Sequence, residues 1–146
     1  MRIGVISDTH GLLRPEALAA LHGVDRILHA GDVGDPAVLD GLRTLAPVTA
    51  IRGNVDREPW AGALPETEVV EVEGVLLYLI HDLQQLDLKP EAAGFGVVIH
   101  GHSHQPRTET ANGVYYFNPG SAGPRRFHLP VSVGRLEIIR GEVKGE

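Results

Sequence analysis

The sequence predicts an α/β fold in which two β-sheets pack face to face and helices lie outside them. Two observations lead to this prediction. Residues 3–54 alternate apolar, strand-like runs with helical runs, which is the pattern of a βαβαβ unit with parallel strands. Residues 66–143 consist mostly of strand-like runs separated by turn signals. The 146 residues match the usual size of one domain, so we expect a single domain over residues 1–146.

The first half reads as strand, helix, strand, helix, strand. The predicted strands cover residues 3–7, 25–32 and 48–54, and the predicted helices cover residues 15–23 and 35–46. Pro15 and Pro36 suit the first position of a helix, Asp35 can cap the second helix, and Gly23 can close the first. The apolar residues expected to face the sheet are Leu18, Leu21, Val38, Leu39, Leu42 and Leu45.

The second half is predicted to contain two hairpins. Residues 67–82 form two strand-like runs joined across Glu73 and Gly74, and the first run has alternating glutamates typical of a solvated face. Asn112 and Gly113 predict the turn of the second hairpin. A helical candidate covers residues 83–93, a loop covers 60–66, and further strands are expected within 96–104 and 130–143.

Composition excludes several classes of protein. Thirteen Lys and Arg against 19 Asp and Glu give a formal charge of −6, which argues against broad binding of nucleic acid. Without cysteine, any metal must be held by nitrogen and oxygen atoms. The longest apolar run, VLLYLI, is far too short to span a membrane. We therefore expect a soluble, cytoplasmic protein that does not bind membranes; its oligomeric state is not predicted.

Polar side chains follow five of the strand-like runs, at the point where each run ends. They are Asp8, His10, Asp32, Asn54, His81, His102 and His104. Because the carboxyl ends of strands in an α/β sheet share one edge, these residues are expected to meet in space. Gly31, Gly53 and Gly101 each precede one of them, and a missing Cβ lets backbone turn sharply or approach an ion closely.

The residue types suit metal binding. Aspartate supplies anionic oxygen, asparagine neutral oxygen and histidine nitrogen, a mixture that suits Mn²⁺, Fe²⁺ or Zn²⁺. Seven donors exceed the needs of one ion, so we predict two ions about 3.5 to 4 Å apart that share a water or hydroxide.

Each motif taken alone has an ordinary structural explanation. Asp8 and His10 could lie in a solvated turn, Asp32 could belong to a capping turn, and Gly53-Asn54 is a common turn dipeptide. The sequence HGHSH is the strongest single motif, because a purely structural role for both His102 and His104 is difficult to explain.

The ordered motifs resemble those of the calcineurin-like metallophosphoesterase superfamily. They are DTH at Asp8 to His10, GD at Gly31-Asp32, GN at Gly53-Asn54, His81, and GHSH at Gly101 to His104. The small size, GNVD at Gly53 to Asp56, and NPGS at Asn118 to Ser121 resemble the compact YfcE-like phosphodiesterase branch. This resemblance implies a double β-sandwich flanked by helices, a four-layer αββα fold.

The resemblance also implies a ligand set and a reaction. One metal would be held by Asp8, His10, Asp32 and His104, and the other by Asp32, Asn54, His81 and His102. Asp32 would bridge the ions, with Asn54 and His10 as the other catalytic residues. The cofactors would be two divalent ions, with manganese expected and iron, zinc, nickel or cobalt as alternatives. The implied reaction is attack of a metal-bridging hydroxide on a small phosphodiester.

One position departs from the pattern of the larger members. Many of them carry a histidine near the leaving group in GNHD or GNHE, and this chain has Val55 there. Valine cannot donate a proton, and a positioned acid is worth about 10² to 10⁴ in rate. We therefore predict a preference for diesters whose leaving oxygen is a weak base.

Several neighbouring residues receive weaker assignments. His29 and His100 are interpreted as buried histidines with backbone partners, with a role behind the metal ligands or in proton transfer as the alternative. Asp56 and Asp82 would orient ligands or form salt bridges. The NPGS segment would support the floor of the site, and Arg125 or Arg126 would contact substrate phosphate.

Three other functions are alternatives. The retromer subunit that resembles these phosphodiesterases has lost ligand character and binds partner proteins, and the complete ligand set here counts against that role. A nuclease would need a DNA-binding extension and a basic track, which this chain lacks, and a small phosphatase is a further alternative. Cyclic nucleotides, short nucleotides and phospholipid-derived diesters all remain possible substrates.

Overall fold

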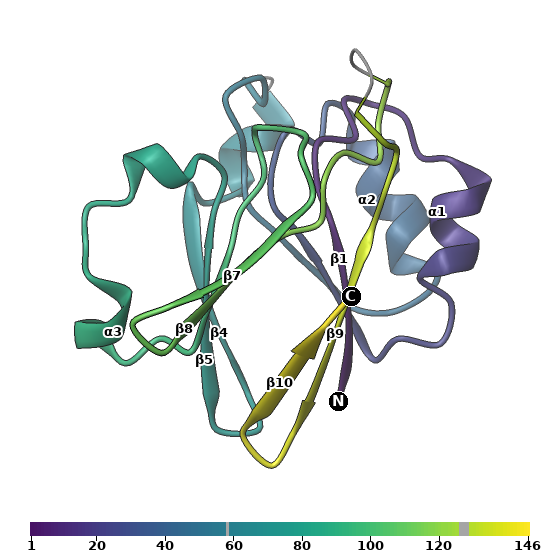
Figure 1. The fold of residues 1–146 in the computed structure, drawn as a ribbon. Coiled ribbons are helices and arrows are strands. Elements are labelled where there is room, and N and C mark those ends of the chain that lie inside the picture. Colours follow the sequence, from purple (N-terminus) through teal and green to yellow (C-terminus); the bar gives the residue numbers. More distant parts are fainter. Residues whose placement is uncertain (58, 126–128) are drawn as a thin grey trace.

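Two five-stranded sheets form the centre of the protein. The computed structural model describes residues 1–57, 59–125 and 129–146. The first sheet has the order β10-β9-β1-β2-β3, with strands Glu142–Gly145, Gly134–Ile139, Arg2–Ile6, Arg26–His29 and Val48–Ala50. The second has the order β4-β5-β6-β8-β7, with strands Thr67–Val72, Val75–Ile80, Val97–Ile99, Val114–Asn118 and Arg107–Ala111. The sheets face each other (Figure 1), so the predicted α/β double-sheet fold is confirmed.

The predicted βαβαβ unit forms half of the molecule. Strands β1, β2 and β3 pair in parallel, connected by α1 (Pro15–Ala20) and α2 (Pro36–Arg43). Pro15 and Pro36 are the first helical residues, and the Asp35 side chain accepts a hydrogen bond from the Ala37 amide at 2.8 Å. Helix α1 ends before Gly23, which lies in the following turn with φ of +86°.

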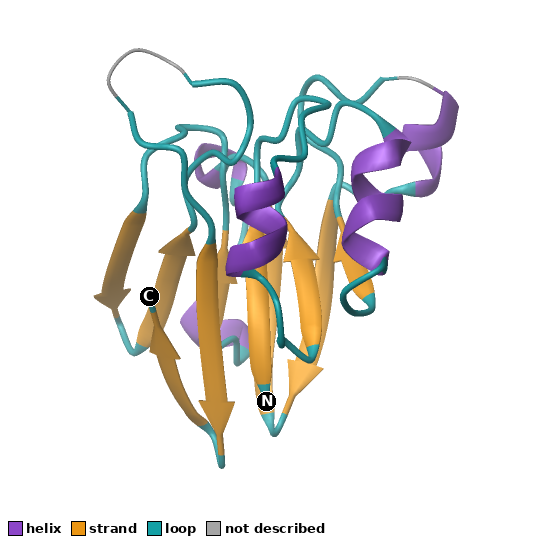
Figure 2. Ribbon diagram, turned by 90° about the vertical axis from the view of Figure 1, so that its right-hand side faces the viewer, coloured by secondary structure: helices purple, strands orange, loops and turns teal. Residues whose placement is uncertain are grey.

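Apolar packing holds these layers together. The two sheets share a core that includes Ile3, Val5, Leu77, Leu79 and Phe117. Helices α1 and α2 cover the outer face of the first sheet (Figure 2). All six predicted sheet-facing residues belong to this outer cluster, with Leu18 and Leu45 only partly buried.

The outer face of the second sheet has a thinner cover than the sequence predicts. The expected helix over residues 83–93 is wrong, because this segment forms η2 (Leu83–Gln85) and α3 (Pro90–Ala93) instead. Leu86 is extended, with φ of −65° and ψ of 118°, and the residue before a proline is also disfavoured in a helix. The segment still buries part of Leu83, Leu86 and Leu88 against the sheet.

The turns mostly follow the predictions. Glu73-Gly74 and Asn112-Gly113 join β4 to β5 and β7 to β8 with positive φ at both residues, as a type I′ hairpin requires. The expected loop at 60–66 instead contains η1 (Pro59–Ala63), and its Trp60 packs partly against the cluster around α1 and α2. Among the described residues, no helix has the length and apolar character needed to cross a bilayer.

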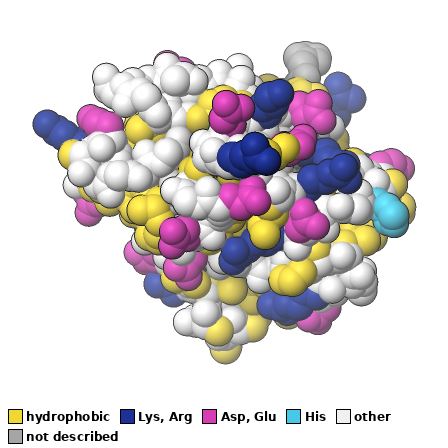
Figure 3. All heavy atoms as spheres, turned by 90° about the horizontal axis from the view of Figure 1, so that it is seen from below, with side chains coloured by type: hydrophobic (Ala, Val, Ile, Leu, Met, Phe, Trp, Pro, Cys, Tyr) yellow, Lys and Arg dark blue, Asp and Glu magenta, His cyan; other side chains and the backbone are white. Residues whose placement is uncertain are grey.

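The loops after β1, β2, β3, β5 and β6 gather at one end of the sandwich (Figures 1 and 2). The opposite end carries acidic and basic side chains interspersed among apolar ones (Figure 3). The predicted ligands lie in the gathered loops, so the fold brings distant parts of the chain together there.

Candidate metal centre

Five of the seven predicted ligands meet where the two sheets come together. Oδ1 of Asp8, after β1, lies 3.4 Å from His104 Nε2 and 3.7 Å from His81 Nε2. Oδ2 of Asp32, after β2, lies 3.1 Å from His81 Nε2 and 3.7 Å from His10 Nε2. Strand ends of both sheets therefore supply one cluster.

The cluster contains two groups that could each hold a cation. One consists of Asp8, His10 and His104, and the other of Asp8, Asp32 and His81, with the ligand atoms of each group within 4.8 Å of one another. Asp8 is common to both groups, while Asp32 Oδ2 approaches both His10 and His81. Either carboxylate is therefore placed to bridge, and the assignment of the bridge to Asp32 stays a prediction.

Asn54 lies beside the second group. Its amide oxygen is 3.2 Å from both carboxylate oxygens of Asp32 and 3.1 Å from His81 Nε2. In this orientation three lone-pair-bearing groups converge, as they do around a cation. Rotating the amide by 180° would instead let its nitrogen donate to the same three atoms.

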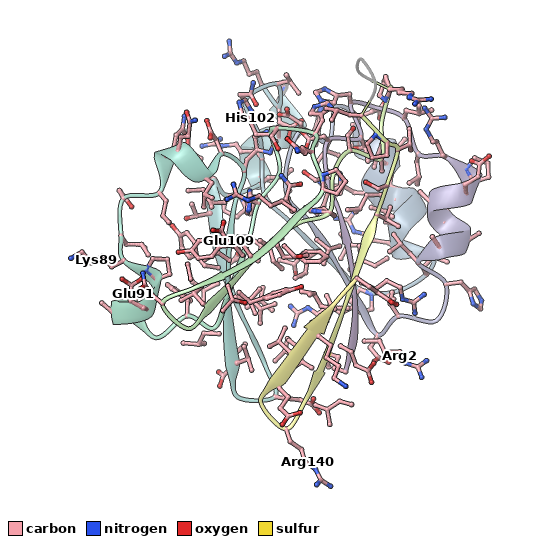
Figure 4. The ribbon with its side chains drawn as sticks, viewed as in Figure 1. Arg2, Lys89, Glu91, His102, Glu109 and Arg140 are labelled. Atoms are coloured by element: carbon pink, nitrogen blue, oxygen red, sulfur yellow. The ribbon has the colours of Figure 1, made fainter. Side chains whose placement is uncertain are left out.

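His102 stands apart from both groups. Its side chain is 46% exposed, and its Nε2 lies 3.9 Å from Asp82 Oδ2. The ring centroid is 5.3 Å from that of His81, with the ring planes 82° apart. Figure 4 shows His102 among the gathered loops, at the opposite end from Arg140. Its imidazole is therefore near the cluster but directed toward Asp82.

Asp8 gives the clearest test of whether the site fits a metal. The side chain is fully buried, and Oδ2 accepts hydrogen bonds from Ser7 Oγ at 2.7 Å and from the His102 amide at 3.1 Å. Oδ1 accepts no hydrogen bond from any described residue. A buried carboxylate oxygen without a donor is costly, and a divalent cation would satisfy it. The donor set therefore fits divalent metal ions.

Comparison with known proteins agrees with this geometry. Residues 1–141 match the family described as "Calcineurin-like phosphoesterase superfamily domain". The chain belongs to the calcineurin-like phosphoesterase superfamily. A probable metallophosphoesterase from Methanothermobacter thermautotrophicus is 41% identical over 94% of this chain and 87% of its own. Phosphodiesterase YfcE of Escherichia coli is 28% identical over 94% of this chain and 88% of its own, so the predicted relationship is confirmed.

Solved structures show the same fold. A novel archaeal phosphodiesterase superposes with a TM-score of 0.83 at 25% identity, covering 100% of this chain and 99% of the other. Wild-type Vps29 from Entamoeba histolytica, complexed with Zn²⁺, superposes with a TM-score of 0.76 at 27% identity, covering 100% and 97%. The calcineurin-like fold is thus shared with proteins described as enzymes and with Vps29.

The electrostatics of this calcineurin-like site follow from burial and charge pairing. Burial raises the pKa of Asp8, although His81 and His104 act in the opposite direction. Burial alone would raise the pKa of Asp32, but the hydrogen bond and charge of His81, with the Val55 amide, lower it. Burial alone would lower the pKa of His81, but Asp32 and Asp8 raise it. The pKa values of the carboxylates and imidazoles in the cluster therefore depend on one another's charges.

The orientation of His81 suits a ligand. Its Nδ1 lies 2.7 Å from the Ala30 carbonyl oxygen, which can only accept, so Nδ1 carries a proton. In the neutral ring the Nε2 lone pair is then free to face the Asp8 and Asp32 carboxylates, and this backbone partner fixes the ring as in known metal sites.

The backbone of the ligand candidates is strained. Five of the predicted ligands have positive φ: Asp8 (55°), His10 (47°), Asp32 (55°), His102 (71°) and His104 (61°). Such left-handed conformations cost residues other than glycine about 1–3 kcal/mol each and concentrate at functional sites. Sequence reasoning missed this feature, because none of the five is a glycine.

Two glycines allow the close approach that the sequence predicts. A Cβ on Gly53 would collide with Asp32 Oδ1 and with the Asp32 backbone nitrogen. A Cβ on Gly101 would lie 2.6 Å from Asp8 Oδ2 and would also collide with Ser7 Oγ. Both glycines therefore let the ligand loops pack directly against the carboxylates.

Asp56 ties two ligand-bearing loops together. Its carboxylate is buried and accepts hydrogen bonds from the amides of Val33 at 3.0 Å, Gly34 at 2.9 Å and Gly53 at 2.9 Å. Among the described residues, its hydrogen bonds go to backbone, not to ligating side chains. It therefore positions Asp32 and Asn54 through the main chain, a more indirect role than the sequence predicts.

The buried histidines His29 and His100 differ in the hydrogen bonds of their rings. His29 Nδ1 accepts from the Gly31 amide at 3.1 Å, and its Nε2 lies 3.0 Å from Thr9 Oγ1, which donates to the Val33 carbonyl. Burial lowers the pKa of His29 to about 4, so the expected buried histidine with a backbone partner is confirmed. Burial also lowers the pKa of His100 to about 4, but its Nε2 meets no hydrogen-bond partner among the described residues.

The NPGS segment lies under the cluster, as predicted. Asn118 Nδ2 donates to the Gly101 carbonyl and to Ser103 Oγ, both at 3.1 Å. Ser121 Oγ donates to the Asp8 carbonyl at 3.0 Å. Arg125 is exposed, and Arg126 lies outside the described residues, so a phosphate contact from either stays a prediction.

Proposed function

We propose that the protein is a divalent-metal-dependent phosphodiesterase. The observation that carries this proposal is the Asp8 carboxylate, whose buried Oδ1 lacks a hydrogen-bond donor among the described residues and faces imidazole nitrogens. The family membership and the relatives named phosphodiesterase support the same reaction class.

The chain supplies ligands for two cations. Asp8, His10, Asp32 and His104 would hold one, and Asp32, Asn54 and His81 would hold the other, with His102 joining after its ring turns away from Asp82. We expect manganese, with iron, zinc, nickel and cobalt as alternatives. When bound, such ions coordinate phosphate oxygens, lower the pKa of a water between them and offset charge that develops during displacement.

The surrounding residues place these donors before a small phosphodiester arrives. Asp32, Asn54 and His10 are the residues that we expect to act directly in catalysis. The Val55 amide donates to Asp32 Oδ1 at 3.0 Å, and this bond leaves Oδ2 directed at His10 and His81. Because the loop is already held in this way, little reorganisation accompanies the reaction.

The Val55 side chain has consequences for the leaving group. It is 46% exposed beside Asn54 and has no proton to donate. We therefore expect aryl phosphodiesters, whose leaving oxygens need no protonation, to be better substrates than alkyl phosphomonoesters. Comparing kcat/KM for the two classes with Mn²⁺ tests this, and faster hydrolysis of the alkyl monoester would refute it.

A protein-binding scaffold is the second candidate, favoured by the structural likeness to Vps29. Hydrolysis of bis(p-nitrophenyl) phosphate distinguishes the two functions. The phosphodiesterase predicts turnover with Mn²⁺, loss of turnover after chelation and loss in Asp8→Asn. Absent turnover in correctly folded protein with Mn²⁺ would favour the scaffold, and turnover that survives chelation would refute the metal dependence.

A further inference from the structure

A cavity of about 770 Å³ opens directly beside the metal-ligand candidates. Asn54, His81 and His102, three of the predicted ligands, contribute to its lining. Its volume is within the range of small-molecule sites, roughly 300–1,000 Å³. A diester phosphate held at the cluster would therefore extend one of its two alcohol groups into this space.

Most of the charged residues in the rest of the lining are acidic. Glu66, Asp82 and Asp87 contribute carboxylates, and Arg52 contributes the lining's one arginine side chain among the described residues. Arg52 Nη2 already pairs with Glu66 Oε1 at 3.2 Å, so its charge is largely compensated. Two carboxylates remain in excess.

These two carboxylates differ in how they are held. Asp82 caps η2, where its Oδ1 accepts from the Gln84 amide at 3.0 Å, and its Oδ2 lies 3.9 Å from His102 Nε2. Asp87 lines the cavity, is exposed, and forms no hydrogen bond or ion pair with any described residue. Asp87 is thus available to a ligand, and it is not part of the metal-ligand set.

We propose that this cavity selects phosphodiesters in which one alcohol carries a positive charge, such as an amino alcohol, over those that carry a second phosphate. This inference rests on the proposed phosphodiesterase function and names the substrate class. The cluster binds the scissile phosphate, so the lining acts on the remainder of the substrate. The carboxylates of Asp87 and Asp82 attract a positively charged group and repel a second phosphate.

An isosteric pair of substrates isolates the charge. p-Nitrophenyl phosphorylcholine and 3,3-dimethylbutyl p-nitrophenyl phosphate have the same shape and leaving group, and only the first carries a positively charged group on its other alcohol. With Mn²⁺ at low ionic strength, Asp87→Asn is expected to lower the ratio of their kcat/KM values about three- to tenfold, and Asp87→Lys is expected to lower it further. Asp40→Asn, an exposed carboxylate on α2 that does not line the cavity, should leave the ratio unchanged.

A second pair tests the predicted repulsion. Adding a 3′-phosphate to thymidine 5′-(p-nitrophenyl phosphate) should lower kcat/KM in the wild type, and Asp87→Lys should reduce this penalty. Ratios that are unchanged in both Asp87 variants would overturn the inference.

Calorimetric binding of phosphorylcholine and of 3,3-dimethylbutyl phosphate provides a readout that does not need turnover. We expect Asp87→Asn to weaken the binding of phosphorylcholine and to leave the binding of 3,3-dimethylbutyl phosphate unchanged. Equal effects on both ligands would overturn the inference, whether or not the protein is active. Failure to hydrolyse bis(p-nitrophenyl) phosphate would count against the proposed function alone.

Discussion

Asp8 is the residue whose surroundings depend most on a bound cation. Its carboxylate is fully buried, one oxygen has two donors and the other has none among the described residues. Burial raises its pKa, which means that the fold opposes its negative charge. The same charge attracts metal. Asp8 therefore lowers the stability of the metal-free protein and raises its affinity for metal.

Replacing Asp8 by asparagine should therefore have opposite effects on stability and on binding. The amide oxygen can keep the hydrogen bonds from Ser7 and His102, and the buried charge disappears. We expect the metal-free Asp8→Asn variant to unfold at a higher urea concentration than the wild type at pH 7, and to bind Mn²⁺ much more weakly. A variant that is less stable without metal and still binds Mn²⁺ normally would contradict this view of Asp8.

His29 should make the stability of the metal-free protein dependent on pH. Its pKa is lowered from 6.5 to about 4 in the folded state, so the unfolded chain binds the proton more readily. Its contribution is fully present above about pH 6.5 and is lost as the pH falls toward 4, by up to about 3 kcal/mol. His29→Gln should flatten the urea-unfolding profile between pH 7 and 4, with the exposed His22→Gln as the control. A His29→Gln profile parallel to that of the wild type would refute this assignment.

At the scale of elements, the loops after β2 and β3 act as one unit. The Asp56 carboxylate accepts hydrogen bonds from backbone amides of both loops, and the backbone of Gly53 packs against Asp32. The fold thereby holds the Asp32 and Asn54 loops together beyond the ends of the paired strands β2 and β3.

Removing this link should weaken metal binding. Asp56→Ala leaves three amides without their acceptor, so we expect a loss of about 2–4 kcal/mol in the free energy of unfolding and a metal affinity about 10- to 100-fold weaker. Asp35→Ala removes only the cap of α2, so it should cost about 1 kcal/mol and leave metal affinity unchanged. Urea unfolding and Mn²⁺ titration measure the two effects, and equal metal affinities in the two variants would contradict the positioning role.

Element-level patterns also explain which parts of the structure the sequence predicts. The alternation of strands and helices predicts β1 to β3, and strand ends predict the meeting of Asp8, Asp32 and His81. The orientation of His102 toward Asp82 depends on tertiary contacts that no local pattern encodes. The positive φ angles of the ligands and the break at Leu86 also escape pattern reasoning, because tertiary packing overrides local preference there.

At the scale of the whole molecule, two sheets serve one site. The first sheet supplies Asp8, His10, Asp32 and Asn54, and the second supplies His81, His102 and His104. The core between the sheets fixes the distance between these sets, so a cation bound across them should stabilise the entire fold.

We propose that this junction binds two divalent cations through the Asp8 and Asp32 carboxylates. Calorimetric titration of the metal-free protein with Mn²⁺ tests it most directly. We predict uptake of about two ions per chain in the wild type, and loss of at least one of them in Asp8→Asn and in Asp32→Asn. No uptake by folded wild-type protein, or the same uptake in all three proteins, would contradict the claim.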